Sequence, residues 1–84
     1  MFNNKTILVT GGTGSFGKKF TRMTLDKFSV KKIIILSRDE MKQWDMSREF
    51  EGDKQVRFFL GDVRDRDRSN RALDDVDFVV HAAV

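Results

Sequence analysis

The chain has 84 residues, a length that folds as one domain at most and buries only roughly 60% of the unfolded surface. The 39% hydrophobic content, with eight Phe and one Trp, favours a folded domain over a disordered segment, and the absence of Cys excludes disulfides and thiolate metal ligation. The net charge of +3 arises from interleaved charges, as in residues 64–68, which favours a solvated helix face over a nucleic-acid patch.

Four short apolar runs predict β-strands at residues 6–9, 33–36, 56–60 and 78–80. The runs are β-branched or aromatic, and three are nearly continuous, as in strands that are buried on both faces of a parallel sheet. They recur about every 25 residues with helix-length spacers between them, which is the βαβα rhythm of an α/β domain. We therefore predict an α/β fold, a partial Rossmann fold with four parallel strands in the order 3-2-1-4 and helices on both faces.

A glycine-rich turn directly follows the first strand. Its residues satisfy Gly-x-Gly-x-x-Gly through Gly12, Gly14 and Gly17, and Thr-Gly-x-x-Gly-x-x-Gly from Thr10 onward. Such a turn provides positive φ, lets the main chain approach a pyrophosphate, and leaves no side chain where helix meets strand. The helix amino terminus then offers free N–H groups and a positive dipole to the phosphates. We interpret the turn as a dinucleotide-binding loop rather than a purely structural turn.

The same turn also matches the start of a nucleoside-triphosphate loop. Residues 12–18 read Gly-x-x-x-x-Gly-Lys, but that loop needs Ser or Thr next to hold magnesium, and Lys19 stands there. Because a cation cannot ligate a cation, the kinase or ATPase interpretation is disfavoured.

Apolar residues at helical spacing predict a helix in each of the first two spacers. The first helix should begin near Ser15 and the second at Asp39, a plausible N-cap. The residues expected to face or cover the sheet are Phe16, Phe20 and Met23 in the first helix, and Met41 and Trp44 in the second. A third helix, short and very polar, is predicted over residues 65–73.

The end of the second strand discriminates between cofactors, because an acidic group about 20 residues past the glycines usually holds the adenosine ribose hydroxyls. Here Ser37 occupies that place and Arg38 follows it, which suits a 2′-phosphate, with Lys42 one helical turn on as a second cation. Asp39 favours NAD instead and keeps that alternative open. We predict NADP as the cofactor.

Small and polar residues also follow the third and fourth strands. Asp62 and Val63 could meet the amino edge and the face of an adenine, although Asp62 is equally suited to cap a turn. Ala82 ends the fourth strand, where a small side chain allows close approach of a ligand. His81 beside it fits a packed structural histidine better than a base.

With these residues placed, the chain resembles the extended short-chain dehydrogenase/reductase superfamily over its whole length. More specifically, residues 10–17, 37–43, 58–65 and 81–83 resemble the inverting UDP-N-acetylglucosamine 4,6-dehydratases of pseudaminic acid and capsule polysaccharide biosynthesis. The resemblance implies a retained NADP that takes a hydride from sugar C4 and returns it to C6 with C5 inverted, after water has left across C5 and C6. The net reaction is that of a lyase.

The resemblance assigns cofactor contacts and no catalytic residue. It implies a pyrophosphate on residues 13–16, the 2′-phosphate and its ribose on residues 37–42, adenine beside Asp62 and Val63, and Ala82 at the inner face of the cofactor. The predicted cofactor-binding residues are Gly11, Thr13, Gly14, Ser15, Phe16, Gly17, Ser37, Arg38, Asp39, Glu40, Lys42, Asp62, Val63 and Ala82. No metal site is assigned.

The family places its catalytic Lys, its Tyr-x-x-x-Lys segment and its sugar site beyond the fourth strand, and this chain contains no Tyr. We therefore expect residues 1–84 to be the amino-terminal half of an NAD(P)-binding Rossmann domain, a fragment without the substrate-binding and catalytic part and inactive by itself. A non-catalytic NADP-binding or sensing module is the alternative. The fourth strand would then be an unpaired apolar edge, which predicts self-association.

The expected cellular location and partners of the protein follow from two features that the sequence lacks. Residues 1–5 lack the features of a secretory signal, and no apolar run approaches the length that spans a membrane. We expect a cytoplasmic protein without membrane or nucleic-acid partners. A nucleotide sugar, UDP-N-acetylglucosamine, is the substrate that the resemblance implies for the full-length family.

Overall fold

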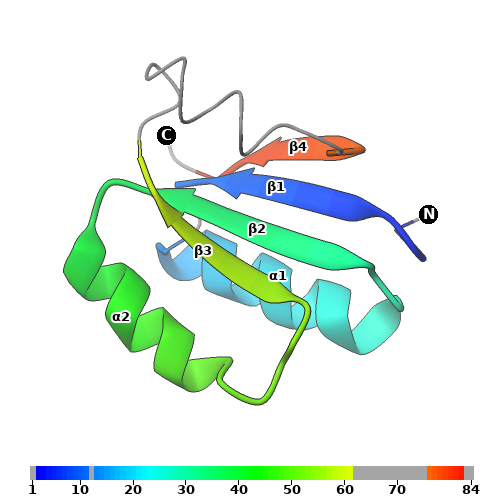
Figure 1. Cartoon of the computed structure of the whole chain (residues 1–84), viewed down its shortest axis with the longest axis horizontal. Coiled ribbons are helices and arrows are strands. Elements are labelled where there is room, and N and C mark those ends of the chain that lie inside the picture. Colours follow the sequence, from blue (N-terminus) through cyan, green and yellow to red (C-terminus); the bar gives the residue numbers. More distant parts are fainter. Residues whose placement is uncertain (1, 12, 62–75, 83–84) are drawn as a thin grey trace.

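The computed structural model describes residues 2–11, 13–61 and 76–82. Within them the chain forms, in order, β1 (Thr6–Thr10), α1 (Ser15–Lys27), β2 (Lys32–Ser37), α2 (Glu40–Glu49), β3 (Val56–Leu60) and β4 (Phe78–His81). The strands make one parallel sheet in the order β3-β2-β1-β4 (Figure 1). The α/β class, the predicted strands and their order are confirmed.

The two central strands are buried on both faces, as their continuous apolar runs predict. The register pairs Ile7 with Ile33 and Leu8 with Ile34, so matched rows of side chains alternate between the faces of the sheet. The first row belongs to the main core cluster, which Met46 of α2 completes, and the second row to a smaller cluster. Since full burial of one such side chain contributes about 1.5–3 kcal/mol, these rows hold the sheet together.

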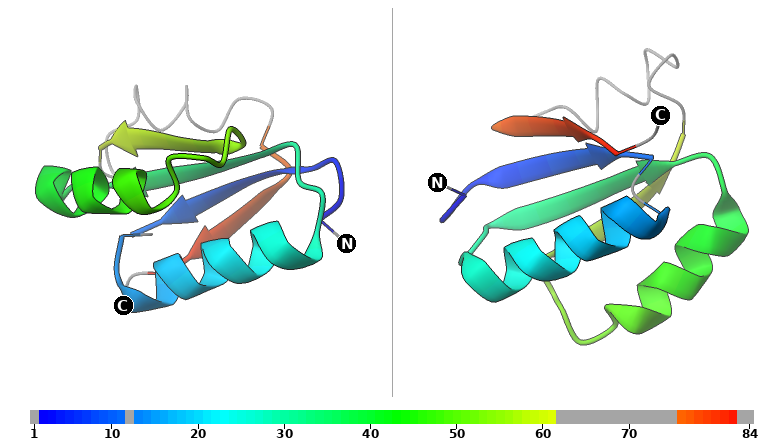
Figure 2. Two further views of the ribbon diagram at one scale, coloured as in Figure 1. Left: turned by 90° about the horizontal axis from the view of Figure 1, so that it is seen from below. Right: turned by 180° about the vertical axis from the view of Figure 1, so that it is seen from behind.

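Both described helices cover the same face of the sheet (Figure 2). Each connects neighbouring parallel strands, α1 between β1 and β2 and α2 between β2 and β3. Crossovers that run in one direction along a sheet and keep the usual right-handed sense place their helices on one side. The third predicted helix, residues 65–73, and with it the expected helix layer on the second face, lies outside the described residues.

The predicted sheet-facing stripe of α1 is wrong at two of its three positions. Phe16 and Met23 are 58% and 43% exposed, and only Phe20 packs against the core. Gly17 and Thr21 lie on the buried face instead, and the Thr21 hydroxyl donates to the Gly17 carbonyl at 2.8 Å. That local hydrogen bond satisfies the buried hydroxyl, so Gly17 and Thr21 can lie on the buried face of α1 together with Phe20.

The predicted apolar face of α2 is also wrong. Met41 and Trp44 are 75% and 58% exposed, whereas Gln43 and Met46 are buried. The Arg48 guanidinium lies over the Trp44 ring, 5.0 Å from its centroid. A helix this short and polar has no strong apolar period, so contacts with the core decide which side is buried.

Among the described residues, no helix is long and apolar enough to cross a membrane.

Candidate functional site

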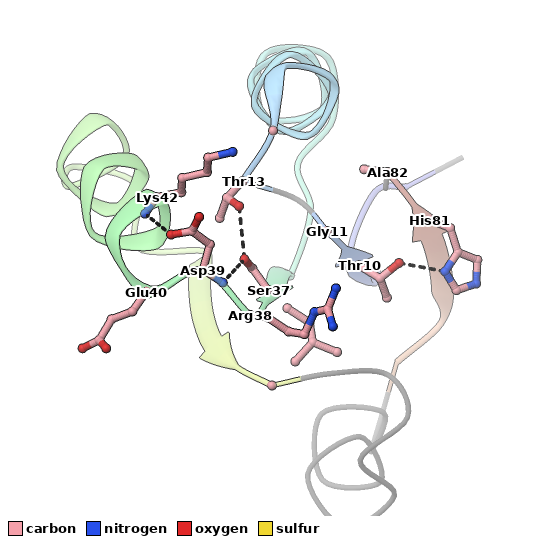
Figure 3. Close-up of a pocket in the computed structure, with 13 residues that line it drawn as sticks. Thr10, Gly11, Thr13, Ser37, Arg38, Asp39, Glu40, Lys42, His81 and Ala82 are labelled. Atoms are coloured by element: carbon pink, nitrogen blue, oxygen red, sulfur yellow. Dashed lines mark hydrogen bonds between the residues drawn. The ribbon is translucent and has the colours of Figure 1, made fainter. Parts of the chain in front are cut away.

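A cleft of about 870 Å³ opens at the carboxyl ends of β1, β2 and β4 (Figure 3). Its position follows from the strand order, because the chain reverses direction across the sheet between β1 and β4, and ligands of open α/β sheets bind at such a reversal. The lining residues are Thr10, Gly11, Thr13, Gly14, Leu36, Ser37, Arg38, Asp39, Glu40, Lys42, Gly61, His81 and Ala82.

The glycine turn forms one wall of this cleft. Gly11 has φ of 64°, in the left-handed region that favours glycine, and its N–H donates to the Leu36 carbonyl at 2.8 Å. Gly14 has φ of −78°, and a Cβ built on it would meet no atom within 4 Å. The chain itself therefore leaves open space over the main chain of Gly14. Gly12, the remaining glycine of the pattern, lies outside the described residues.

The amino termini of the two helices differ in the number of carboxylates that the chain places beside them. The N-cap of α1 is Gly14, which has no side-chain acceptor, and the first turn of α1 contains no acidic residue. The N-cap of α2 is Asp39, as predicted, and its Oδ1 accepts the Lys42 N–H at 3.0 Å, with Glu40 in the first turn. The α2 terminus is thus neutralised by the chain's own carboxylates, whereas the α1 terminus can accept an external anion.

The hydroxyl of Ser37 joins the two sides of the cleft. It shares a buried hydrogen bond of 3.1 Å with the Thr13 hydroxyl and accepts the Asp39 N–H at 3.1 Å. These contacts connect the glycine turn to the end of β2 and to the start of α2. Ser37 therefore holds the site together through a side chain that is only 5% exposed.

Two cations line the cleft beside these groups. Arg38 extends its guanidinium from the end of β2 toward the β1 side, and Lys42 lies on the first turn of α2 (Figure 3). The Glu40 side chain points away from Thr13 and Ser37 in the same view. An anion in the cleft would therefore meet positive charge near the end of β2.

The side of the cleft at β4 is polar and exposed. The Nδ1 atom of His81 shares a hydrogen bond of 2.7 Å with the Thr10 hydroxyl, and the Ala82 N–H donates to the Thr10 carbonyl at 2.8 Å. His81 is exposed, which corrects the expectation of a packed histidine. The reason is that β4 is the outer strand of the described sheet, so its end is not covered by a neighbouring strand.

The structure brings most of the predicted cofactor-binding residues together. Those that line the cleft are Gly11, Thr13, Gly14, Ser37, Arg38, Asp39, Glu40, Lys42 and Ala82. Ser15 and Phe16 are exposed at the start of α1 and are not among the residues that line the cleft, and Gly17 is buried in the helix. Asp62 and Val63 lie outside the described residues.

The predicted cofactor-binding residues leave out five residues at the site. Thr10, Leu36, Gly61 and His81 line the cleft, and Gln43 donates hydrogen bonds to the main-chain carbonyls of Ser37 and Phe59. The position of Thr10, Leu36 and Gly61 at strand ends was a usable signal, because ligands meet that edge of a parallel sheet. Gln43 had no such signal, since its role depends on which side of α2 is buried.

The strand order and the glycine turn define the class of this protein as a Rossmann-type α/β domain. Within that class, the model of a family described as "Polysaccharide biosynthesis protein" matches residues 7–84, and the chain belongs to that family.

Curated relatives share about half of their aligned residues with this chain. The UDP-N-acetylglucosamine 4,6-dehydratase (inverting) of Campylobacter jejuni is 57% identical over 83 residues, which are 99% of this chain and 25% of that protein. A UDP-glucose 4-epimerase of Rickettsia bellii is 46% identical over 87 residues, again 99% of this chain and 25% of that protein. The chain spans about a quarter of the length of the curated relatives it matches.

Solved structures share the fold. Pen from Bacillus thuringiensis superposes with a TM-score of 0.91 at 33% identity, over 100% of this chain and 26% of that one. The dTDP-glucose 4,6-dehydratase from Bacillus anthracis, solved in complex with NAD, gives a TM-score of 0.78 at 22% identity, over 95% of this chain and 27% of that one. At that identity the second likeness shows the fold alone.

Proposed function

We propose that this chain is the NADP-binding part of an inverting UDP-N-acetylglucosamine 4,6-dehydratase that works in the cytoplasm in polysaccharide or flagellin-glycan biosynthesis. The glycine turn, the open amino terminus of α1 and the two cations beside β2 support dinucleotide binding. The 57% identity to the Campylobacter jejuni dehydratase, against 46% to the Rickettsia bellii epimerase, supports the dehydratase over the epimerase.

The positions and contacts of the carboxylates near the end of β2 support NADP rather than NAD as the cofactor. An NAD site places a carboxylate on the ribose 2′-hydroxyl, and that charge would repel a 2′-phosphate. Here the last residue of β2 is Ser37, which has no charge. The Asp39 Oδ1 atom accepts a main-chain N–H of α2, and the Glu40 side chain points away from the glycine turn (Figure 3). Arg38 and Lys42 line the cleft on this side and supply positive charge for a phosphate.

Within the proposed enzyme, the described residues bind and orient the cofactor and perform no proton transfer. Thr13 and Gly14 would hold the diphosphate through main-chain N–H groups, and Arg38 and Lys42 would hold the 2′-phosphate. The methyl side chain of Ala82 allows the cofactor to lie close to the end of β4. When bound, the cofactor supplies a hydride acceptor that is regenerated within the reaction, so the net change is loss of water.

Calorimetric titration with NADP and NAD tests the cofactor assignment. We expect the chain to prefer NADP and Arg38→Ala to weaken NADP binding about tenfold or more, because a charge-assisted hydrogen bond to phosphate is lost. NAD affinity should change by less than about twofold, since NAD lacks the 2′-phosphate. Arg48→Ala, which removes the same charge from the outer side of α2, is the matched control. Equal affinities for NADP and NAD would contradict the assignment.

A chimera tests the dehydratase assignment. The chain would replace the aligned quarter of the Campylobacter jejuni enzyme, and products from UDP-N-acetylglucosamine would be identified by NMR. We expect a 4-keto product from the chimera and none from the 84-residue chain alone. A folded chimera without product, beside an active parent enzyme, would refute the proposal.

A non-catalytic NADP-binding or sensing module is the second candidate. It is favoured by one observation, namely that a cleft with a glycine turn and two cations is formed within the described residues. NADP-selective binding by a monodisperse chain, combined with an inactive chimera, would favour the module over the dehydratase.

A further inference from the structure

Gln43 is a buried polar residue of α2 with an unusual pair of acceptors. Its side chain is only 7% exposed, in the second turn of the helix. Its Nε2 donates to the main-chain carbonyls of Ser37, at 3.3 Å, and Phe59, at 2.5 Å. Because these carbonyls belong to the carboxyl ends of β2 and β3, one amide group ties the helix to two neighbouring strand ends.

The Ser37 carbonyl is also an acceptor for the next segment of the chain. The Gly61 N–H donates to it at 2.9 Å, while the Ser37 hydroxyl contacts Thr13 and accepts the Asp39 N–H. Gln43 therefore completes a network in which both oxygens of Ser37 are engaged. Networks of this kind rigidify a site when every member is satisfied.

The two cations of the cleft lie on the segment that this network fastens. Arg38 directly follows Ser37, and Lys42 directly precedes Gln43, so residues 38–42 are held at both ends. Gln43 itself is not among the residues that line the cleft, and it cannot act by touching a ligand there. Its effect must pass through the placement of its neighbours.

We propose that Gln43 is a positioning residue that sets the selectivity for NADP over NAD. By holding residues 38–42 at a fixed separation from Thr13, it places Arg38 and Lys42 where a 2′-phosphate lies when the diphosphate is on the glycine turn. The inference rests on the proposed function. It adds a determinant of cofactor choice that the sequence pattern around Ser37 does not reveal.

Two substitutions remove the amide donors with little change in side-chain length. Gln43→Met replaces the amide by an apolar group, and Gln43→Glu places a carboxylate opposite two carbonyl oxygens. Gln55→Glu is the matched control, because Gln55 is exposed in the loop before β3. Kd values for NADP and NAD would be measured by calorimetry, with folding checked by circular dichroism.

We expect both Gln43 variants to bind NADP about tenfold more weakly while NAD affinity changes by less than about twofold, so the selectivity ratio falls. A merely structural role would lower both affinities together or neither. Gln55→Glu should leave the ratio unchanged. Amide hydrogen exchange at Gly61 should become faster in the Gln43 variants. The Gly61 N–H donates to the Ser37 carbonyl, and that carbonyl loses its hydrogen bond from Gln43 in these variants.

The outcomes separate the two proposals. An unchanged ratio in folded Gln43 variants of a chain that prefers NADP would overturn the positioning role alone. Unfolding of both variants, where the parent chain and Gln55→Glu are folded, would make Gln43 a purely structural residue and overturn it too. A parent chain that does not prefer NADP would overturn the proposed cofactor, and the positioning role would fall with it.

Discussion

Gly11 and Gly14 belong to one turn but need glycine for different reasons. Gly11 adopts φ of 64°, which most side chains disfavour, so glycine there serves the backbone. Gly14 adopts an extended conformation that any residue can take, and the space above it is empty. Nothing in the described chain requires glycine at position 14, so we attribute that glycine to the close approach of a ligand.

Gly14→Ser tests this attribution at the scale of one residue. Serine is a favoured N-cap and fits the open space, so the free energy of unfolding should fall by less than about 0.5 kcal/mol. Its side chain would occupy the space where a diphosphate meets the main chain, and NADP affinity should fall about tenfold or more. Gly52→Ser is the control, because a Cβ at Gly52 also meets no atom within 4 Å. Unaltered NADP binding by folded Gly14→Ser would contradict the attribution.

Sequence analysis predicted which residues gather around Ser37, but not the contacts of the site between residues that are far apart in the chain. Residues 37–42 contain Ser37, Asp39 and the two cations, Arg38 and Lys42. These residues are therefore grouped at the site as soon as a strand is predicted to end at Ser37. The contact between Thr10 and His81 joins residues that are 71 positions apart, and it depends on the pairing of β1 with β4. Local turn chemistry is readable from sequence, whereas such contacts depend on the register of the sheet.

At the scale of elements, the starts of the helices were predictable and their buried faces were not. Ser15 and Asp39 were identified from the glycine turn and from capping chemistry, both of which are local. The face of α1 was wrong at Phe16 and Met23 because the prediction followed the spacing of apolar residues, whereas the buried residues of the helix are Gly17, Thr21 and Thr24. Small and polar residues on a buried helix face leave no trace in a hydrophobic pattern.

Gly17→Val tests the packing of α1 on the sheet. A larger side chain at this buried position should lower the free energy of unfolding by about 1–3 kcal/mol through overpacking, as measured by urea denaturation. Lys19→Val introduces the same side chain at an exposed position of α1, with an expected loss below about 1 kcal/mol from helix propensity. Equal losses in the two variants would show that the helix does not press on the sheet at Gly17.

For the whole molecule, the sheet order was predictable because the βαβ rhythm and the right-handed crossover rule leave few alternatives. Within the described residues the order leaves β4 as an outer strand, and Phe78 and Val79 are 37% and 44% exposed. Outer strands with apolar side chains and unpaired main-chain groups pair with other chains. We propose that this chain self-associates through β4.

Sedimentation velocity at tens of micromolar tests the self-association. The chain should sediment faster than a 9.8 kDa monomer, and Val79→Lys should restore the monomer because charge on an outer strand opposes pairing. Met41→Lys, at an exposed position of α2, should associate like the parent chain. A parent chain that sediments as a monomer would count against association through β4.

The central claim is that the turn between β1 and α1 holds a diphosphate through its main chain. Titration of the ¹⁵N-labelled chain with NADP, followed by amide chemical shifts, tests this claim most directly. We expect the largest shifts at Thr13, Gly14 and Ser15, and a second group at Arg38 and Lys42. Saturation with NADP that leaves the amides of the turn unmoved would contradict the claim.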